Sequence, residues 1–366
     1  MKVAFLADNL NQDNGWGVYA KNLIVNLQKH GLQPVVFVSR GRPNILFAKA
    51  YLFSYYDDSF KKIKAFLDYK KIQRYLKEVD LVHVLHEPYA YLGGIIKNKL
   101  KKPFFLTGHG TYLIKPLDNT RLLKLYQPAY QSADKIICVS QYTRNQLRQR
   151  LRLNNLTVIH NGVSINQFSG FKRARAKNPP QLLSVGGLKE RKNQMFGLEV
   201  FRQLKPIFPE IKYKIIGTID SPDYFNKLQQ FIKAYKLKDV SIMTNITVES
   251  LRKYYHESDI FLMPSKKVGC DIEGFGLVYL EAAASGLPAI GLQGSGASEA
   301  IKDGFSGFVV NDQNQAVDQI KSLLTKPDLY SQISQAALTW AKEHDWASLA
   351  LNYLNLYERV VAEYQK

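Results

Sequence analysis

Short hydrophobic runs alternate with longer amphipathic stretches along the chain, a pattern that predicts parallel strands joined by crossover helices. In the first half we expect strands at 3–6, 35–38, 81–85, 104–107, 135–139 and 157–159, with helices near 18–30, 120–131 and 142–151. In the second half we expect strands at 182–185, 213–216, 240–243, 260–263, 288–291 and 308–310, with helices near 193–204, 224–235, 248–256 and 277–285. The stretch 44–78 interrupts the pattern with lysines and aromatic residues, and we expect it to be helical in part.

The alternation stops at 169–180, where charge, glycine and a proline pair indicate a linker. The chain therefore divides into an N-terminal Rossmann-like domain, 1–168, and a C-terminal one, 181–345. The helix predicted at 346–366 is a candidate to return to the first domain. Because ligands of doubly wound sheets bind beyond the carboxyl ends of the strands, we expect a site in a cleft where the two α/β domains face each other.

Composition narrows the class of protein. Hydrophobic residues make up 46% and charged residues 22%, as in globular proteins. No apolar stretch approaches the roughly 20 residues needed to span a bilayer. The apolar run at the N-terminus ends at Asp8, so no signal peptide is expected. Cys138 and Cys270 are far apart in sequence and fit neither a disulfide framework nor a metal knuckle, so we expect a reducing, cytoplasmic location.

The net charge of +19 is unevenly distributed. Residues 1–170 contain 25 Lys and Arg against 10 Asp and Glu, whereas the remainder contains 25 against 21. This bias indicates that the first half faces an anionic partner. The segment 47–76 interleaves aromatic and aliphatic residues with Lys61, Lys62, Lys64, Lys70 and Lys71, which is typical of an element at a membrane surface. The alternative is a solvated, lysine-rich face.

The strongest chemical motif is DIEGFGLVYLEAAASGLP at 271–288. A helix that begins after the Gly-Phe-Gly turn directs unpaired backbone N–H groups and its positive dipole end at a ligand, which suits a diphosphate. Gly274 and Gly276 allow close approach of the backbone. The carboxylates of Glu273 and Glu281 are suited to accept hydrogen bonds from sugar or ribose hydroxyls. The alternative is that both are solvated charges.

EGFGLVYLE resembles the E-x7-E signature of glycosyltransferase family 4, a family of retaining enzymes with the GT-B fold. The stretches GLPAIGLQGSGASEAIKDGFSGFVV, VIHNGVS, CVSQYTR and SVGGLKERKN are also similar to this family, so the resemblance covers most of the chain. The stretch DIEGFGLVYLEA is most similar to mannosyltransferases that elaborate phosphatidylinositol.

The resemblance implies a donor site around the motif. Glu273 would contact hydroxyls of the donor sugar and Glu281 the ribose, while three backbone amides would bind the diphosphate, those of Phe275, Gly276 and Leu277. Lys192 matches a family lysine that neutralises the diphosphate. The family arginine is replaced by Gly187, and Arg191 is the expected substitute, with Lys189 a weaker candidate. Ile246 would lie against the nucleobase, just before a helix capped by Thr247.

In the first domain, Asn14-Gly15-Trp16-Gly17 follows the first strand and opens a helix, where Rossmann proteins bind anions. A flexible loop is the alternative. The resemblance favours Gly15 and Gly17 as close-approach positions near the leaving phosphate. Trp16 is not the usual residue of the family at its position, and we expect it to shape the acceptor site. His109, in TGHGT after a strand, matches an active-site histidine of the family and would contact the sugar or stabilise the reacting centre.

The resemblance therefore implies a retaining, metal-independent hexosyltransferase with no protein-bound intermediate and no cofactor. The donor would be a UDP- or GDP-sugar, and the acceptor a hydroxyl of a glycan or lipid-linked molecule in cell-surface polysaccharide or glycolipid synthesis. The N-terminal domain would bind the acceptor and the C-terminal domain the donor. We expect a cytoplasmic enzyme, with a peripheral position on the inner face of the cell membrane as a hypothesis. Two alternatives remain open, a non-catalytic sugar-nucleotide binder and, less favoured, a basic nucleic-acid-binding protein.

Overall fold

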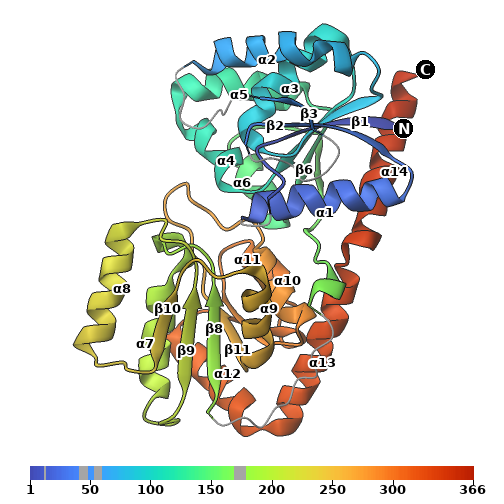
Figure 1. The fold of residues 1–366 in the computed structure, drawn as a ribbon. Helices are drawn as coiled ribbons and strands as arrows, with labels where there is room; N and C mark the ends of the chain where they lie inside the picture. The colour runs from blue at the N-terminus through green and yellow to red at the C-terminus, as the bar shows by residue number, and fades with distance from the viewer. Residues whose placement is uncertain (12–13, 41–47, 53–59, 169–178) are drawn as a thin grey trace. The chain divides into compact units, whose positions relative to one another are not determined.

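The computed structural model describes residues 1–11, 14–40, 48–52, 60–168 and 179–366. The chain forms two compact units, residues 1–162 with 346–366, and residues 163–345 (Figure 1). The first unit ends at Gly162, earlier than the expected position 168. Val163 N donates to His344 O, and Phe168 lies edge-on to Tyr255, so this short segment belongs to the second unit. The predicted linker lies largely outside the described residues, which resume at 179.

The first unit is built on a seven-stranded parallel sheet with the order β3-β2-β1-β4-β5-β6-β7. The strands are β1 (Lys2–Ala7), β2 (Gln33–Val38), β3 (Ala48–Tyr51), β4 (Leu81–Val84), β5 (Phe104–Gly108), β6 (Lys135–Cys138) and β7 (Leu156–Val158). The predicted strands of this half are confirmed, whereas β3 was not predicted. The strand order reverses direction between β1 and β4, which makes their carboxyl ends the switch point of the sheet.

Helices flank this sheet on both sides (Figure 1). They are α1 (Gly15–Lys29), α2 (Lys61–Leu76), α3 (Ala90–Leu100), α4 (Thr111–Ile114), α5 (Thr120–Ser132), α6 (Gln141–Arg148) and α14 (Trp346–Tyr364), with short 3-10 turns η1 (Glu87–Tyr89) and η2 (Lys115–Asp118). Helix α1 contacts α14, while α3 contacts both α2 and α5. Helix α1 begins at Gly15 because the side chain of Asn14 accepts a hydrogen bond from Gly17 N at 2.9 Å.

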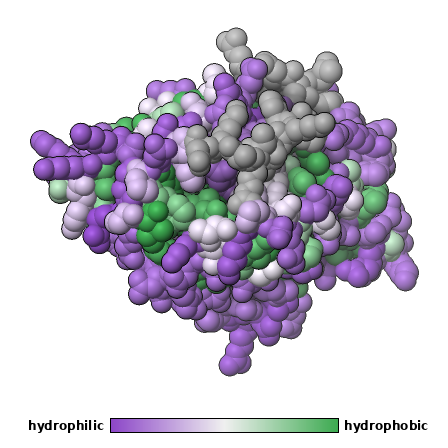
Figure 2. Space-filling view, turned by 90° about the horizontal axis from the view of Figure 1, so that it is seen from below, coloured by the Kyte–Doolittle hydropathy of each residue, from purple (hydrophilic) through white to green (hydrophobic). Residues whose placement is uncertain are grey.

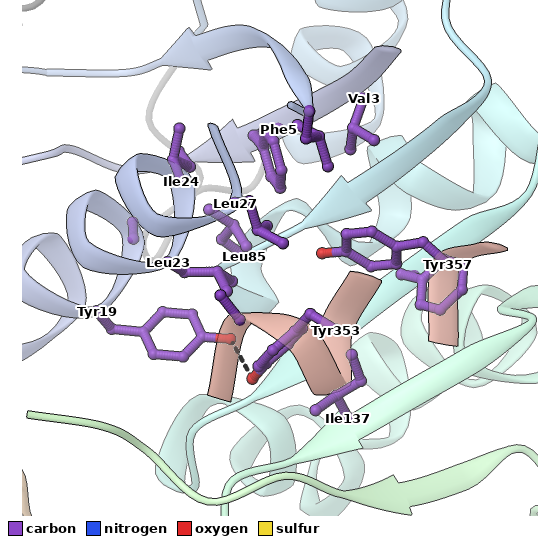
Figure 3. Packing of buried hydrophobic residues seen from close by; sticks show 14 of the residues in the cluster. Val3, Phe5, Tyr19, Leu23, Ile24, Leu27, Leu85, Ile137, Tyr353 and Tyr357 are labelled. Carbon is purple, nitrogen blue, oxygen red and sulfur yellow. Dashed lines mark hydrogen bonds between the residues drawn. The ribbon is translucent and has the colours of Figure 1, made fainter. Parts of the chain in front are cut away.

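Helix α14 completes the core of the first unit (Figure 3). Tyr353 and Tyr357 are buried among aliphatic side chains of β1 and α1, and the hydroxyls of Tyr19 and Tyr353 are 2.9 Å apart. His83 lies in the same network, with Nδ1 2.5 Å from the Tyr357 hydroxyl and Nε2 2.8 Å from that of Thr107. Both ring nitrogens of His83 are thus engaged in hydrogen bonds within the core.

The second unit is built on a six-stranded parallel sheet with the order β10-β9-β8-β11-β12-β13. Its strands are β8 (Gln181–Val185), β9 (Lys212–Ile216), β10 (Val240–Met243), β11 (Ile260–Met263), β12 (Ala289–Leu292) and β13 (Gly307–Val310), as predicted. Its helices are α7 (Gln194–Leu204), α8 (Pro222–Ala234), α9 (Val248–Glu257), α10 (Leu277–Ala284), α11 (Ala297–Ala300), α12 (Gln313–Thr325) and α13 (Pro327–Glu343), with 3-10 turns η3 (Ile165–Gln167) and η4 (Glu190–Lys192). Here the switch point lies between β8 and β11.

On the face drawn in Figure 2, hydrophilic side chains border a hydrophobic area below and at the left. Within the described ranges, none of the helices combines the length and apolar character that a membrane span requires.

Candidate functional site

Two loops meet at the switch point of the second unit. One leaves β8 through Gly186 and forms η4, which carries Arg191 and Lys192; the other leaves β11 and runs to the start of α10. Because β8 and β11 are neighbours in the sheet, these loops lie side by side, and Lys266 N donates to Arg191 O at 2.9 Å. The sheet topology thus brings together the cations of one loop and Glu273 of the other.

Glu273 is the centre of a buried ionic cluster. Its Oε2 accepts hydrogen bonds from Arg191 Nη1 at 2.6 Å, Lys192 Nζ at 2.5 Å and Ser265 Oγ at 3.3 Å. Arg191 also forms an ion pair with Asp271, with Nε 2.9 Å from Oδ1. Burial alone would raise the pKa of Glu273, but Arg191 and Lys192 outweigh it and lower the pKa to about 2. The cluster therefore holds two cations against one fully ionised carboxylate and the flanking Asp271.

The electrostatics of the two cations differ. Burial lowers the pKa of Lys192, with Glu273 opposing the effect. Burial acts in the same sense on Arg191, but the carboxylates of Glu273 and Asp271 prevail and raise its pKa. Arg191 thus remains charged inside the cluster beside Glu273, and its expected role toward a diphosphate stays a prediction.

The start of α10 adjoins Glu273. Gly276 precedes the helix with φ 86°, a left-handed conformation that favours glycine, and no side chain caps the helix. A helix start of this kind presents backbone N–H groups that can donate hydrogen bonds to an anion. The backbone of the turn packs tightly against Gly296, because a Cβ at that position would lie 1.9 Å from Gly274 O. The Phe275 side chain is buried. Only backbone groups of Phe275 are therefore candidates for ligand contact.

Glu281 lies one turn into α10. Its carboxylate accepts a hydrogen bond from the buried Tyr255 hydroxyl at 2.8 Å, and burial raises the pKa of Glu281. Tyr255 belongs to α9, which Thr247 caps by accepting from Ser250 N at 3.1 Å, as predicted. The half-buried Ile246 immediately precedes that cap. Helix α9 thus connects the expected nucleobase position to the expected ribose position.

A specific contact accounts for Gly187 at the position of the family arginine. A Cβ on Gly187 would lie 2.2 Å from Oδ2 of Asp220. Asp220 is itself paired with Lys189 at 2.7 Å and accepts from the Thr218 hydroxyl at 2.7 Å. A side chain at position 187 therefore requires Asp220 to move, and Lys189 is engaged by Asp220 and not by the Glu273 cluster.

In the first unit, Gly15, Trp16 and Gly17 open α1 at the switch point. A Cβ on Gly17 would lie 2.0 Å from Asn11 O and 2.3 Å from Asn9 Oδ1, so this glycine is required by the packing of its own loop. The indole of Trp16 stacks on the His86 ring, with centroids 4.6 Å apart and planes at 10°.

His109 follows β5 and lies close to this stack. Its Nε2 is 2.8 Å from Leu85 O, and its ring meets Tyr19 edge-on at 4.5 Å. Because a carbonyl oxygen only accepts, Nε2 carries the proton and Nδ1 is the acceptor atom. Burial lowers the pKa of His109 to about 4, so the imidazole is neutral at physiological pH. His86 has the same tautomer, since its Nδ1 accepts from Asp8 N at 2.7 Å.

Three polar groups that support these positions were not predicted from the sequence. Ser265 and Tyr255 donate to Glu273 and Glu281, and Glu87 accepts from the backbone of the His109 turn. Only Glu87 carried a signal, because it is a charged residue two positions after the strand predicted at 81–85. Within the part of the chain that the structure describes, no three His, Cys, Asp or Glu side chains are grouped so as to hold a metal ion.

Comparison with known families covers nearly the whole chain. Residues 166–340 match the family described as "Glycosyl transferases group 1", and residues 13–167 match "Glycosyltransferase Family 4". An uncharacterized glycosyltransferase, MJ1178, from Methanocaldococcus jannaschii is 24% identical over 307 residues, which is 82% of each chain. A GDP-mannose-dependent alpha-(1-6)-phosphatidylinositol monomannoside mannosyltransferase from Mycolicibacterium smegmatis is 26% identical over 70% of each chain.

Solved structures share the fold. Anabaena Alr3699/HepE in complex with UDP and glucose superimposes with a TM-score of 0.81 at 17% identity, over 98% of this chain and 100% of that one. Sucrose-phosphate synthase from Thermosynechococcus elongatus gives a TM-score of 0.84 at 19% identity, over 99% and 100%. These structures and the two Rossmann-like sheets show that the chain has the GT-B fold. The two family matches, which together span residues 13–340, show that it is a glycosyltransferase of group 1 and family 4.

Proposed function

We propose that this glycosyltransferase transfers a hexose from a UDP- or GDP-sugar to a hydroxyl of a glycan or lipid-linked acceptor, with retention of configuration and without a metal ion. The observation that carries the donor half of the proposal is the ionic cluster of Arg191, Lys192 and Glu273 beside the uncapped start of α10. It combines two fixed cations with backbone donors, which is what a diphosphate requires.

The proposed reaction exchanges one bond at the anomeric carbon for another. The bond between the anomeric carbon and the diphosphate oxygen breaks, and its electron pair stays on the diphosphate. The acceptor oxygen bonds to the anomeric carbon on the same face, and its proton passes to the departing diphosphate. Lys192, Arg191 and the α10 amides stabilise the charge that accumulates on the leaving group. These fixed positive groups take the place that a divalent cation has in other sugar transferases.

The remaining residues are assigned to binding. Glu273 accepts from donor-sugar hydroxyls, Glu281 from the ribose, and Ile246 lies against the base. The neutral His109 contacts the sugar through Nδ1, and Gly15 and Gly17 allow the loop at α1 to approach the leaving phosphate. Two similar proteins support a nucleotide sugar as donor. One relative is described as GDP-mannose-dependent, and one structural neighbour was solved with UDP and glucose.

A thermal-shift screen with UDP, GDP, ADP and dTDP, each with and without EDTA, tests the donor half. A ligand at 100 times its dissociation constant stabilises a protein by about 2.7 kcal/mol. We expect one base to stand out, with the same shift in EDTA and with a reduced shift in Lys192→Met. A shift that depends on Mg²⁺ would contradict the metal-independent proposal, and no shift with any nucleotide would contradict the donor proposal.

Catalysis is separated from simple binding by turnover. The responding nucleotide, supplied as its radiolabelled sugar conjugate, is incubated with bacterial glycolipid extract and with oligosaccharides. Label incorporated into a product supports the transferase. A protein that binds the donor but gives neither product nor hydrolysis would be the sugar-nucleotide binder instead. Nucleic-acid binding is the less favoured alternative, and a gel-shift titration with duplex DNA at physiological salt tests it.

We further propose that α2 docks this enzyme on an anionic membrane surface near a lipid-linked acceptor. The solvent face of α2 carries large apolar side chains, with Phe60 62%, Ile63 59% and Leu67 49% exposed. Its buried face includes Asp68, so the usual polarity of a surface helix is partly inverted. Lys62, Lys70 and Arg74 are exposed on the same helix. Apolar residues that point outward among cations suit the interface of an anionic bilayer.

The sequence pattern favours the segment 47–76 for this role. The structure describes 48–52 and 60–76 of it, whereas Phe47 and 53–59 lie outside the described residues. Co-sedimentation with phosphatidylcholine vesicles, with and without phosphatidylglycerol, tests the described part. We expect binding to the anionic vesicles at low salt, and its loss in Ile63→Ser/Leu67→Ser and in Lys62→Glu/Lys70→Glu. Lys321→Glu/Lys326→Glu, on the other unit, is the matched charge control. No binding by the wild type would contradict the proposal.

A further inference from the structure

Glu87 is a buried carboxylate that the proposed chemistry does not use. It follows β4 at the switch point of the first unit and is fully buried. Its Oε1 accepts from the backbone N–H groups of His109 at 2.5 Å and Gly110 at 3.2 Å. Its Oε2 is buried without a hydrogen-bond partner, and no cation among the described residues pairs with it. A buried carboxylate oxygen without a partner lowers the stability of the fold, so the position of Glu87 requires an explanation.

The turn that Glu87 binds is one the chain could not hold by local capping. Gly110 has φ 135° and ψ −105°, a conformation that favours glycine, and no side chain of the turn caps the short helix that follows. Two consecutive N–H groups there point toward the protein interior, where each requires an acceptor. The Glu87 carboxylate is that acceptor.

The ring of His109 is held by the same segment of chain. Its Nε2 donates to Leu85 O, two residues before Glu87. The β4–η1 connection therefore fixes His109 twice, through Leu85 at the imidazole and through Glu87 at the backbone. Tyr19, edge-on at 4.5 Å, limits rotation of the ring. If the turn moved, the short bond to Leu85 O would be lost, and with it the preference for one tautomer.

We propose that Glu87 is the positioning residue of His109: by accepting from both amides of the turn, it keeps Nε2 on Leu85 O and leaves Nδ1 as an acceptor for a substrate hydroxyl. The contact with substrate rests on the proposed function, whereas the effect on the tautomer does not. Since a neutral amide oxygen can also accept two N–H groups, the role requires the acceptor atom and its reach more than the negative charge.

The ring nitrogens of His109, observed by NMR in protein labelled with ¹⁵N at histidine, test the proposal. His109→Asn identifies the signals. We expect the wild type to show one protonated and one unprotonated nitrogen, and Glu87→Gln to retain this pair. In Glu87→Ala the two signals should move toward each other as the tautomers interconvert. Wild-type signals in Glu87→Ala would overturn the proposal.

Two further variants complete the experiment. Tyr126→Phe removes a buried hydrogen bond to Pro88 O in the same η1 turn without touching the His109 turn, so its His109 signals should be those of the wild type. If Glu87→Ala does not fold, Glu87→Asp replaces it, because the shorter carboxylate keeps the charge but cannot reach both amides; unchanged signals in Glu87→Asp would likewise overturn the proposal.

Turnover then connects the tautomer to the proposed function. With the donor found in the nucleotide screen, we expect kcat of Glu87→Ala to fall by up to about 100-fold while KM for the donor changes little, and Glu87→Gln to restore most of the rate. A change in the His109 signals without any sugar-transfer activity in the wild type would remove the proposed function and leave the positioning role intact. A wild-type kcat in a Glu87→Ala protein with altered signals would overturn the catalytic part of the proposal.

Discussion

Replacing Glu273 by Gln should destabilise the second unit strongly, because it leaves two buried cations without their shared carboxylate. The side chains of Arg191, Lys192 and Glu273 are only 13%, 12% and 10% exposed. The pKa of Glu273, lowered from 4.5 to about 2, corresponds to about 3 kcal/mol of favourable interaction at neutral pH. Removing one partner of a buried ion pair generally costs about 3–5 kcal/mol, which agrees with that value. We therefore expect Glu273→Gln to lose about 3 kcal/mol.

Hydrogen exchange of the amides in β11 and α10 is the suitable assay, since it reports on the second unit alone in a chain whose two units need not unfold together. Glu190→Gln is the matched control. It makes the same substitution one residue before Arg191, but its ion pair with Lys227 is long, at 3.4 Å, and half exposed. We expect this control to cost less than about 1 kcal/mol.

The stabilisation by Glu273 should depend on pH. Because the folded pKa of Glu273 is depressed, its stabilisation is present above about pH 4.5 and is lost as the pH falls toward 2. The difference between wild type and Glu273→Gln should therefore shrink over that range. A nucleoside diphosphate should stabilise Glu273→Gln more than the wild type, because its charge replaces the missing carboxylate. Equal stability of Glu273→Gln and Glu190→Gln at pH 7 would refute the reasoning.

Three further results are expected. Gly187→Ala should cost up to about 1 kcal/mol, because the new methyl group turns Asp220 away from its ion pair with Lys189. In a double-mutant cycle of urea unfolding this cost should disappear when Asp220 is already replaced by Ala; additive losses would contradict the close contact. Tyr353→Phe should cost about 1 kcal/mol in the first unit, since Tyr19 keeps its bond to Thr107 at 3.0 Å, and a hydrogen-exchange change confined to the second unit would be inconsistent with the packing. Burial raises the pKa of Glu87 to about 7, so the folded state binds this proton more tightly than the unfolded state does. The free energy of unfolding should therefore fall by up to about 3 kcal/mol as the pH rises from about 4.5 to about 7. In urea titrations of the first unit, Glu87→Gln should abolish this pH dependence.

The parallel-sheet fold and the donor motif could be predicted because their signals are local. Each strand is a short apolar run, and Glu273, Gly276 and Glu281 lie within one stretch of sequence. The family resemblance assigned Arg191 and Glu273 to one site, but their direct ion pair could not be predicted, because it depends on β8 and β11 being neighbours. That pairing joins residues about eighty positions apart, and a single sequence does not reveal it.

The elements that were not predicted have specific physical causes. Helix α3 contains Gly93 and Gly94, which suggest a turn, but a Cβ there would lie 2.3 Å from Phe104 and 3.2 Å from Ala129, so both glycines serve close packing. Strand β3 is four residues long and lies at the edge of the sheet, within a lysine-rich stretch. Glu87 resembled a surface residue because a glutamate is rarely fully buried.

The contribution of α14 to the core of the first unit has a consequence for biosynthesis. Residues 163–345 form one uninterrupted unit, whereas the other unit needs residues 346–366 in addition to 1–162. Until α14 has been translated, Gly162 lacks the Trp346 ring against which it packs, and Tyr19 lacks its partner Tyr353. The part of the chain that leaves the ribosome first is therefore the last to reach its final core, and it must wait with apolar surface uncovered while the later part folds. Nascent chains of this enzyme should depend on chaperones mainly through their N-terminal residues.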